Sequence, residues 1–164
     1  MTQKKLVLFG AGKIGRSFIG QLFSKGGYEV VFIDVYKPVI ETLNQRGKYK
    51  VIIKEQDELV IWVENVRGVW ANDHEIVVRE IQNADLIAVS VGQNGLPGIM
   101  HLVASGLIQR FEANPTSAID IIIAENLRNA AGFFETELTK LLPKDYPFHR
   151  SEERRVGKEC RSRW

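Results

Sequence analysis

Three glycines in the spacing Gly-x-Gly-x-x-Gly, at positions 10, 12 and 15, limit the folds that are open to this chain of 164 residues. The apolar run 5–9 comes directly before them and predicts a buried strand. Apolar residues at helical spacing follow over 14–23 and predict an amphipathic helix. A strand that turns on glycines into a helix is the unit in which backbone N–H groups can bind a diphosphate.

Each glycine of the motif has a predicted role in a dinucleotide site. Gly10 permits the tight turn, Gly12 lets the backbone approach a pyrophosphate, and Gly15 lets the helix pack closely on the strand. The alternative is a glycine-rich turn that binds nothing, but the position between a strand and a helix favours binding. The candidate cofactor-binding residues of this turn are Gly10, Ala11, Gly12, Lys13, Ile14, Gly15 and Arg16.

Apolar runs and helical patterns alternate along the rest of the chain. The runs that predict further buried strands cover residues 28–33, 86–91 and 119–124. The segments that predict helices cover residues 38–46, 72–81, 100–108 and 127–142. This alternation predicts an α/β fold with a doubly wound parallel sheet and helices on both faces, the Rossmann dinucleotide-binding fold. Ligands of such a sheet bind beyond the carboxyl ends of its strands.

Residues 49–70 depart from the alternation and predict up to three short strands. Trp62 and Trp70 are expected to pack among these strands. After residue 91, closely spaced Gly and Pro residues predict a loop over 92–98.

Asp34 ends the second predicted strand, nineteen positions after Gly15. A carboxylate at this place can accept hydrogen bonds from both hydroxyls of the adenosine ribose. It also repels a 2′-phosphate, which favours NAD over NADP as the cofactor, although Lys37 lies close enough in the sequence to leave NADP open. The alternative role for Asp34 is to cap the helix that follows, and the two roles are compatible.

Glu125 and Asn126 follow the predicted strand 119–124 directly, which places two polar side chains at the carboxyl edge of the sheet. Asn126 could donate a hydrogen bond to a substrate oxygen and stabilise charge that develops there. It could equally cap the next helix, and spacing alone does not separate these two roles. Arg16 and Arg128, in the first turns of their predicted helices, could reach phosphate groups or simply lie at the surface.

Composition excludes several other classes of protein. The chain has 22 Lys and Arg residues, six of them in residues 150–164, and 20 Asp and Glu residues, three of them in the same segment. Residues 1–149 therefore carry a net charge of −1. They offer no basic face for nucleic acid. No apolar run approaches a membrane span or a signal-peptide core, so we expect a cytoplasmic protein without membrane contact. A single cysteine and three histidines without ligand spacing predict neither a disulfide nor a metal site.

The sequence resembles the amino-terminal half of the polyol-specific long-chain dehydrogenases, and within that family the branch that acts on mannitol 1-phosphate. The residues that carry the resemblance are FGAGKIGRSFIG at 9–20, FIDV at 32–35 and IIIAENLR at 121–128. It covers roughly residues 4–148. The glycine run together with the later Glu-Asn pair is much more specific than the glycines alone.

The resemblance implies an NAD-linked interconversion of D-mannitol 1-phosphate and D-fructose 6-phosphate. The implied partner of the protein is therefore a small-molecule substrate, a sugar phosphate. It assigns the diphosphate contact to Gly10, Gly12 and Gly15, the ribose contact to Asp34 and the substrate-oxygen contact to Asn126, which favours function over capping there. Members of the family have no catalytic zinc and use a lysine base from a helical carboxyl-terminal domain. That substrate domain is missing from this chain, so we expect the chain to bind NAD and to be nearly inactive.

Residues 150–164 differ from the rest of the chain, because they lack apolar periodicity and are rich in arginine. They look like an in-frame translation of adapter sequence joined to a truncated gene, and the alternative is a genuine basic tail. We therefore predict an NAD-binding Rossmann domain over 1–149 and a non-native tail over 150–164. Two other functions stay open: a hexuronate reductase or mannitol 2-dehydrogenase of the same family, and a non-catalytic NAD-sensing module.

Overall fold

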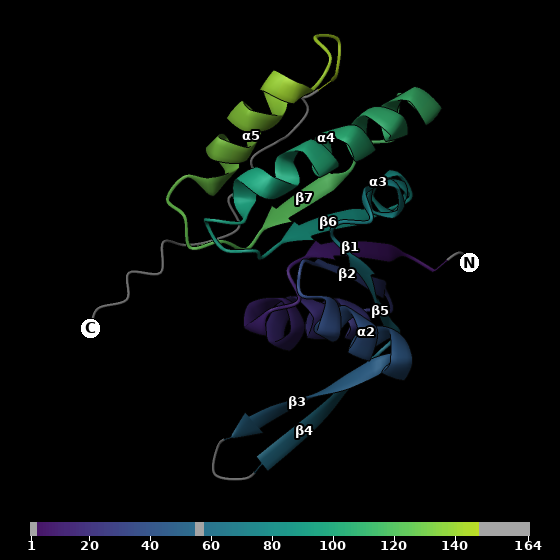
Figure 1. The fold of residues 1–164 in the computed structure, drawn as a ribbon, viewed down its shortest axis with the longest axis vertical. Helices are drawn as coiled ribbons and strands as arrows, with labels where there is room; N and C mark the ends of the chain where they lie inside the picture. Colours follow the sequence, from purple (N-terminus) through teal and green to yellow (C-terminus); the bar gives the residue numbers. More distant parts are fainter. Residues whose placement is uncertain (1–2, 55–57, 148–164) are drawn as a thin grey trace.

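Five short apolar runs pair in parallel and form the central sheet of the computed structural model, which describes residues 3–54 and 58–147 (Figure 1). In spatial order, the strands are β5 (Val66–Trp70), β2 (Glu29–Asp34), β1 (Lys5–Phe9), β6 (Leu86–Val89) and β7 (Asp120–Ile123). The chain moves outward from β1 in one direction and then returns to add strands on the other side. This order is that of a doubly wound Rossmann sheet, as the sequence predicts.

Helices cover both faces of the sheet (Figure 1). One face carries η1 (Gly15–Gly20), a π-helical segment that continues into α1 (Gln21–Lys25), together with α2 (Lys37–Arg46). The other face carries α3 (His74–Gln82), α4 (Leu96–Ala113) and α5 (Ala130–Leu141).

Side chains of β1 alternate between the two apolar cores that these layers enclose. Leu6 and Leu8 belong to the cluster on the η1 and α2 face, and Val7 and Phe9 belong to the cluster on the α4 face. All four are at most 1% exposed. Burial on both faces explains why the strand is apolar throughout rather than alternating with polar residues.

The segment 49–70 separates into a hairpin and an edge strand. β3 (Lys48–Lys54) and β4 (Glu58–Glu64) pair antiparallel and project from the body, while β5 returns to the edge of the main sheet (Figure 1). Tyr49 and Val63 attach the base of the hairpin to the body. Trp62, which we expected to pack, is 57% exposed because its neighbour Val63 takes the inward face of the strand.

The first helix also differs from its predicted packing. Ile19 is buried, but Ile14, Phe18 and Leu22 are each at least half exposed. Glycines take their place against the sheet: a Cβ on Gly20 would lie 2.6 Å from the ring of Phe32 and from the hydroxyl of Tyr49. The helix therefore approaches too closely for an apolar side chain to be inserted, and part of its apolar stripe faces outward.

Two smaller predictions near helix ends are wrong. Pro97 lies in the first turn of α4 rather than in a loop, a position where its missing N–H costs no hydrogen bond. Helix α5 begins at Ala130 instead of residue 127, so Arg128 precedes the helix. Asp73 occupies the cap position of α3, but its side chain makes no capping hydrogen bond.

Candidate dinucleotide-binding site

The turn after β1 is closely packed at two of its three glycines. Gly10 has a φ of +99°, and its N–H donates to the carbonyl of Ile33 at the end of β2 (2.8 Å). A Cβ on Gly10 would overlap the backbone of Ser90, and a Cβ on Gly15 would overlap the carbonyl oxygen of Gly10. The turn thus requires glycine at both positions for steric reasons that do not involve a ligand.

Gly12 differs from these two glycines. A Cβ at this position would meet no atom within 4 Å, so packing does not require glycine here. The carbonyl of Gly12 accepts the N–H of Arg16 (3.0 Å), which closes the first turn of the helix. The N–H groups at such a helix start have no partner within the helix and are suited to an anion.

Asp34 connects the turn after β1 to the turn after β2. Its Oδ2 accepts the N–H of Ala11 (2.7 Å) and its Oδ1 accepts the N–H of Tyr36 (2.8 Å). The second bond forms an Asx turn. The cap position of α2 is Tyr36 itself and has no side-chain cap, so the structure does not show Asp34 capping that helix. The carboxylate is fixed at the carboxyl edge of the sheet, between the two turns.

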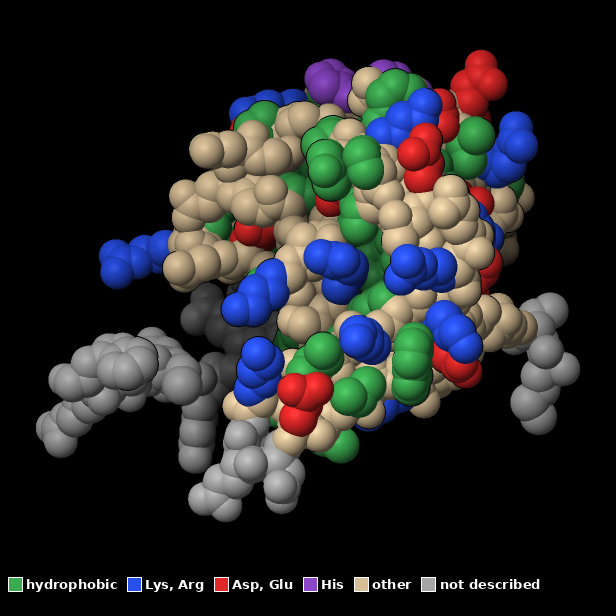
Figure 2. Space-filling model, turned by 60° about the horizontal axis from the view of Figure 1, so that its bottom comes forward, with side chains coloured by type: hydrophobic (Ala, Val, Ile, Leu, Met, Phe, Trp, Pro, Cys, Tyr) green, Lys and Arg blue, Asp and Glu red, His purple; other side chains and the backbone are tan. Residues whose placement is uncertain are grey.

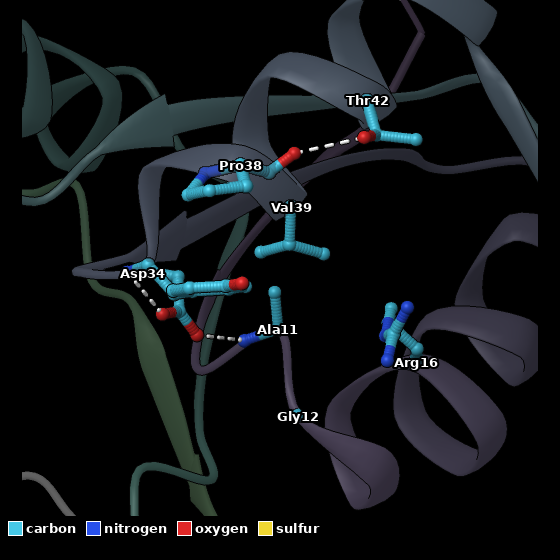
Figure 3. A pocket seen from close by; sticks show the side chains of 8 residues that line it. Ala11, Gly12, Arg16, Asp34, Pro38, Val39 and Thr42 are labelled. Atoms are coloured by element: carbon cyan, nitrogen blue, oxygen red, sulfur yellow. Dashed lines mark hydrogen bonds between the residues drawn. The ribbon is translucent and has the colours of Figure 1, made fainter.

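A pocket of about 500 Å³ opens between these elements (Figure 3). Asp34 and Ala11 form one side of it, and Arg16 extends from the helix on the other side (Figure 3). The residues that line it are Ala11, Gly12, Arg16, Asp34, Tyr36, Pro38, Val39 and Thr42. The pocket therefore offers a carboxylate, a guanidinium and an apolar wall to one ligand.

Lys37 points toward Trp70, the strand neighbour of Asp34, and does not line the pocket. Its ammonium lies 5.1 Å from the centre of the Trp70 ring, in cation–π geometry, and Lys37 is not among the residues that line the pocket. The indole N–H of Trp70 donates to the carbonyl of Val35 (3.2 Å), which holds the ring beside α2. Lys37, the residue that kept NADP possible as the cofactor in the sequence analysis, is thus positioned against Trp70, while Asp34 lines the pocket.

Tyr49 supports the pocket from the hairpin, and the sequence alone did not single it out. Its hydroxyl donates to the backbone carbonyl of Arg16 (2.6 Å), and its ring lies against Phe32. Burial raises the pKa of this phenol well above its usual value, although the charge of Arg16 acts in the opposite direction. Tyr49 is therefore a neutral donor that fixes the helix turn from which Arg16 projects.

Ser90 is the second group that the sequence did not reveal. Among the side chains of residues 3–54 and 58–147, its Oγ is the buried polar atom that has no hydrogen-bond partner. It lies beneath the glycine turn, 3.0 Å from the position that a Cβ on Gly15 would occupy. Its place at the end of β6 is the signal that could have found it. A buried hydroxyl without a partner, next to this turn, fits a site that is completed by a ligand or a bound water.

Glu125 and Asn126 connect the ends of β6 and β7. Glu125 Oε1 accepts the N–H of Gly92 (2.9 Å), and the side chain of Gln93 donates to the carbonyl of Asn126 (2.6 Å). The cap position of α5 is Asn129, three residues after Asn126, so Asn126 does not cap this helix. Its side chain is exposed at the carboxyl edge of the sheet.

The described residues show neither a metal centre nor a membrane span. Within 3–54 and 58–147, no three His, Cys, Asp or Glu side chains are grouped to hold a metal ion. No helix in the same part of the chain is long and apolar enough to cross a membrane.

A parallel sheet in this strand order, a glycine turn into the first helix and an acid at the tip of the next strand define a Rossmann domain of the dinucleotide-binding class. Residues 4–157 match the model of the mannitol dehydrogenase Rossmann domain, and the chain belongs to this family. The resemblance that the sequence motifs indicated is thereby confirmed. The match ends within 150–164, which lie outside the described residues, and the interpretation of that segment as non-native stays a prediction.

Named relatives agree with this assignment. Mannitol-1-phosphate 5-dehydrogenases of Streptococcus pneumoniae strains Hungary19A-6 and ATCC 700669 / Spain 23F-1 are each 39% identical to the chain over 140 residues. The alignment covers 85% of this chain but only 37% of each relative. A UDP-glucose dehydrogenase from the hyperthermophilic archaeon Pyrobaculum islandicum matches 85% of this chain and 33% of its own, with a TM-score of 0.57 and 14% identity. The last comparison shows the fold alone.

Proposed function

We propose that this chain is the NAD-binding part of a dehydrogenase that interconverts D-mannitol 1-phosphate and D-fructose 6-phosphate in the cytoplasm. Family membership supports a dehydrogenase of this kind, and the names of the two Streptococcus relatives support mannitol 1-phosphate over a hexuronate or free mannitol. The observation that carries the proposal is the pocket between the open side of Gly12 and the carboxylate of Asp34.

The residues present fit a dinucleotide. The open side of Gly12 and the helix start behind it receive the diphosphate, since no side chain blocks the backbone there. Asp34 receives the hydroxyls of the adenosine ribose and disfavours a 2′-phosphate by charge repulsion. NAD supplies the hydride acceptor when it is bound. The preference for NAD over NADP rests on Asp34 in the pocket and on the position of Lys37 against Trp70.

The substrate contact in this chain is Asn126. Its exposed side chain at the carboxyl edge of the sheet can donate a hydrogen bond to the oxygen of the reacting carbon. The general base comes from the part of the relatives that this chain does not cover. Because such a base contributes a factor of roughly 10²–10⁴ in rate, we expect the chain to bind NAD and to be nearly inactive. Robust oxidation of mannitol 1-phosphate by the purified chain would contradict this assignment of the base.

Titration of the chain with NADH and with NADPH, followed by calorimetry, tests the cofactor. We expect NADH to bind more tightly. Replacing Asp34 by Asn removes the charge and should weaken NADH binding roughly tenfold or more, the value of a hydrogen bond to a charged group, and narrow its advantage over NADPH. Glu41→Gln on α2, outside the pocket lining, is the matched control and should bind as the wild type does.

Two results would overturn the proposal. One is the absence of any response to NADH in a chain whose circular dichroism shows a folded protein. The other is an unchanged preference between the two dinucleotides in Asp34→Asn, which would mean that the carboxylate does not face the ribose.

A further inference from the structure

One face of the β3–β4 hairpin lies free on the surface. We define the outer hairpin face by the side chains that point away from the body. They are Lys48, Lys50, Ile52 and Lys54 of β3 and Glu58, Val60, Trp62 and Glu64 of β4. In Figure 2, which brings the lower part of Figure 1 forward, hydrophobic side chains lie among Lys and Arg on the facing surface.

The centre of the outer hairpin face consists of large apolar side chains that are exposed to solvent. Trp62 is 57% exposed, Val60 42% and Ile52 39%. The body cannot cover them, because it packs on the opposite face of the hairpin, through Tyr49 and the fully buried Val63. A row of large apolar side chains on a projecting hairpin is the kind of surface that another molecule covers.

The charges of this face have a regular distribution. Its basic residues are all on β3 and its acidic residues are both on β4. The strand register pairs Lys48 with Glu64 and Lys54 with Glu58 at the two ends of the hairpin. Between these ends it pairs Lys50 with Trp62 and Ile52 with Val60. The face is thus basic along one edge, acidic along the other and apolar in the centre.

A second copy of the same face is its complement. If a twofold axis runs along the hairpin, β3 of one copy lies over β4 of the other. Each side chain then lies over a residue of the same type as its own partner across the hairpin. Lysine then lies over glutamate at both ends, and Ile52 lies over Val60 in the middle. In this geometry Lys50 also lies over Trp62, whose ring carries the ammonium of Lys48 of its own hairpin at 5.3 Å.

Other arrangements of two copies are less favourable. A twofold axis across the hairpin would place β3 over β3 and bring lysines together, which is repulsive. With the axis along the hairpin, the two bodies lie on the outer sides, because each packs on the opposite face of its own hairpin. The two sheets can then approach face to face, as in aligned sheet packing.

We propose that the outer hairpin face is a self-association surface, through which two copies of this chain pack hairpin against hairpin about a twofold axis parallel to the strands. Seven residues per strand at a rise of about 3.3 Å give a contact of about 23 Å in length. A contact of this size, two strands wide, is small compared with obligate interfaces, and the association should therefore be reversible and depend on concentration.

Sedimentation of two complementary charge variants tests the proposal. The first carries Lys48→Glu and Lys54→Glu, and the second carries Glu58→Lys and Glu64→Lys. The wild type should shift from monomer to dimer as the micromolar concentration rises. Each variant alone should associate at least tenfold more weakly, since all four end contacts become repulsive. An equimolar mixture should regain association as a one-to-one heterodimer, because opposite charges then meet again.

The heterodimer separates this proposal from an effect on folding, since hairpin charges that act only within one chain cannot make two variants bind each other. Glu137→Lys with Lys140→Glu exchanges an exposed ion pair on α5 and is the matched control, which should associate as the wild type does. A wild type that sediments as a monomer throughout, or a mixture that shows no heterodimer, would overturn the proposal.

Discussion

Alanine at Gly12 and alanine at Gly15 add the same methyl group to one turn, three residues apart. At Gly15 the new Cβ would overlap the carbonyl oxygen of Gly10 and lie 3.0 Å from Ser90 Oγ. At Gly12 it would meet no atom within 4 Å. Gly15→Ala should therefore reduce stability, and Gly12→Ala should reduce cofactor binding.

The size of each effect follows from these neighbours. Overpacking costs about 1–3 kcal/mol, and Gly15→Ala should lie at the upper end because a backbone carbonyl cannot rotate away as a side chain can. For a domain of this size, 3 kcal/mol corresponds to a loss of roughly 6–12 °C in Tm. Gly12→Ala should leave Tm unchanged or raise it slightly, since alanine reduces the entropy of the unfolded chain.

The effect of Gly12→Ala on affinity comes from the diphosphate. A methyl group between the backbone and the phosphate oxygens removes at least one hydrogen bond to a charged group, which is worth about 1.5–3 kcal/mol. NADH should therefore bind roughly 10- to 100-fold more weakly. Thermal unfolding by circular dichroism and calorimetric titration with NADH give the two quantities. Wild-type affinity in Gly12→Ala would refute the placement of the diphosphate, and a wild-type Tm in Gly15→Ala would refute the steric argument.

Two further predictions concern groups that hold the domain together. Glu80 accepts hydrogen bonds from Arg67 (2.8 Å) and Lys5 (2.9 Å), and although burial acts to raise the pKa of Glu80, these two cations lower it below its usual value. Its contribution to stability is thus present above its ordinary pKa and is lost as the pH falls through its lowered pKa. Glu80→Gln should reduce the free energy of unfolding by about 1–3 kcal/mol at neutral pH. Urea titrations should show that this difference between wild type and variant shrinks in acid. A difference that does not change with pH would contradict the charge assigned to Glu80. Tyr49→Phe removes the donor to the Arg16 carbonyl and should cost about 1 kcal/mol and weaken NADH binding, whereas unchanged unfolding and binding would show that the hydroxyl does not support the pocket.

The sequence was sufficient for the sheet and for the position of the glycine turn. Runs such as 5–9 are apolar throughout because the sheet is covered on both faces, and this property is local enough to be read from consecutive residues. The same holds for Asp34, whose position at the end of β2 follows from the length of the strand. Residues 4–157 match the family that the motifs had indicated.

Packing between distant segments was not accessible in the same way. The apolar spacing of Phe18 and Leu22 predicts a buried stripe, but Gly15 and Gly20 take the inward positions because the helix approaches the sheet so closely. A hydrophobic pattern records which residues are apolar, and it does not record how near two backbones come. Tyr49 and Ser90 were missed for a related reason, since each acquires its role from a segment far away in the sequence.

The geometry of Asp34 connects the stability of the turn to its proposed function. Both carboxylate oxygens already accept a backbone N–H, one from Ala11 and one from Tyr36, so the side chain is oriented before any ligand arrives. Each oxygen retains a further lone pair, and the ribose hydroxyls can use these without breaking the bonds that hold the two turns. Binding therefore requires little reorganisation of the carboxylate, which favours affinity. Asp34→Asn should consequently lower both Tm and NADH affinity, whereas Gly12→Ala should lower the affinity alone.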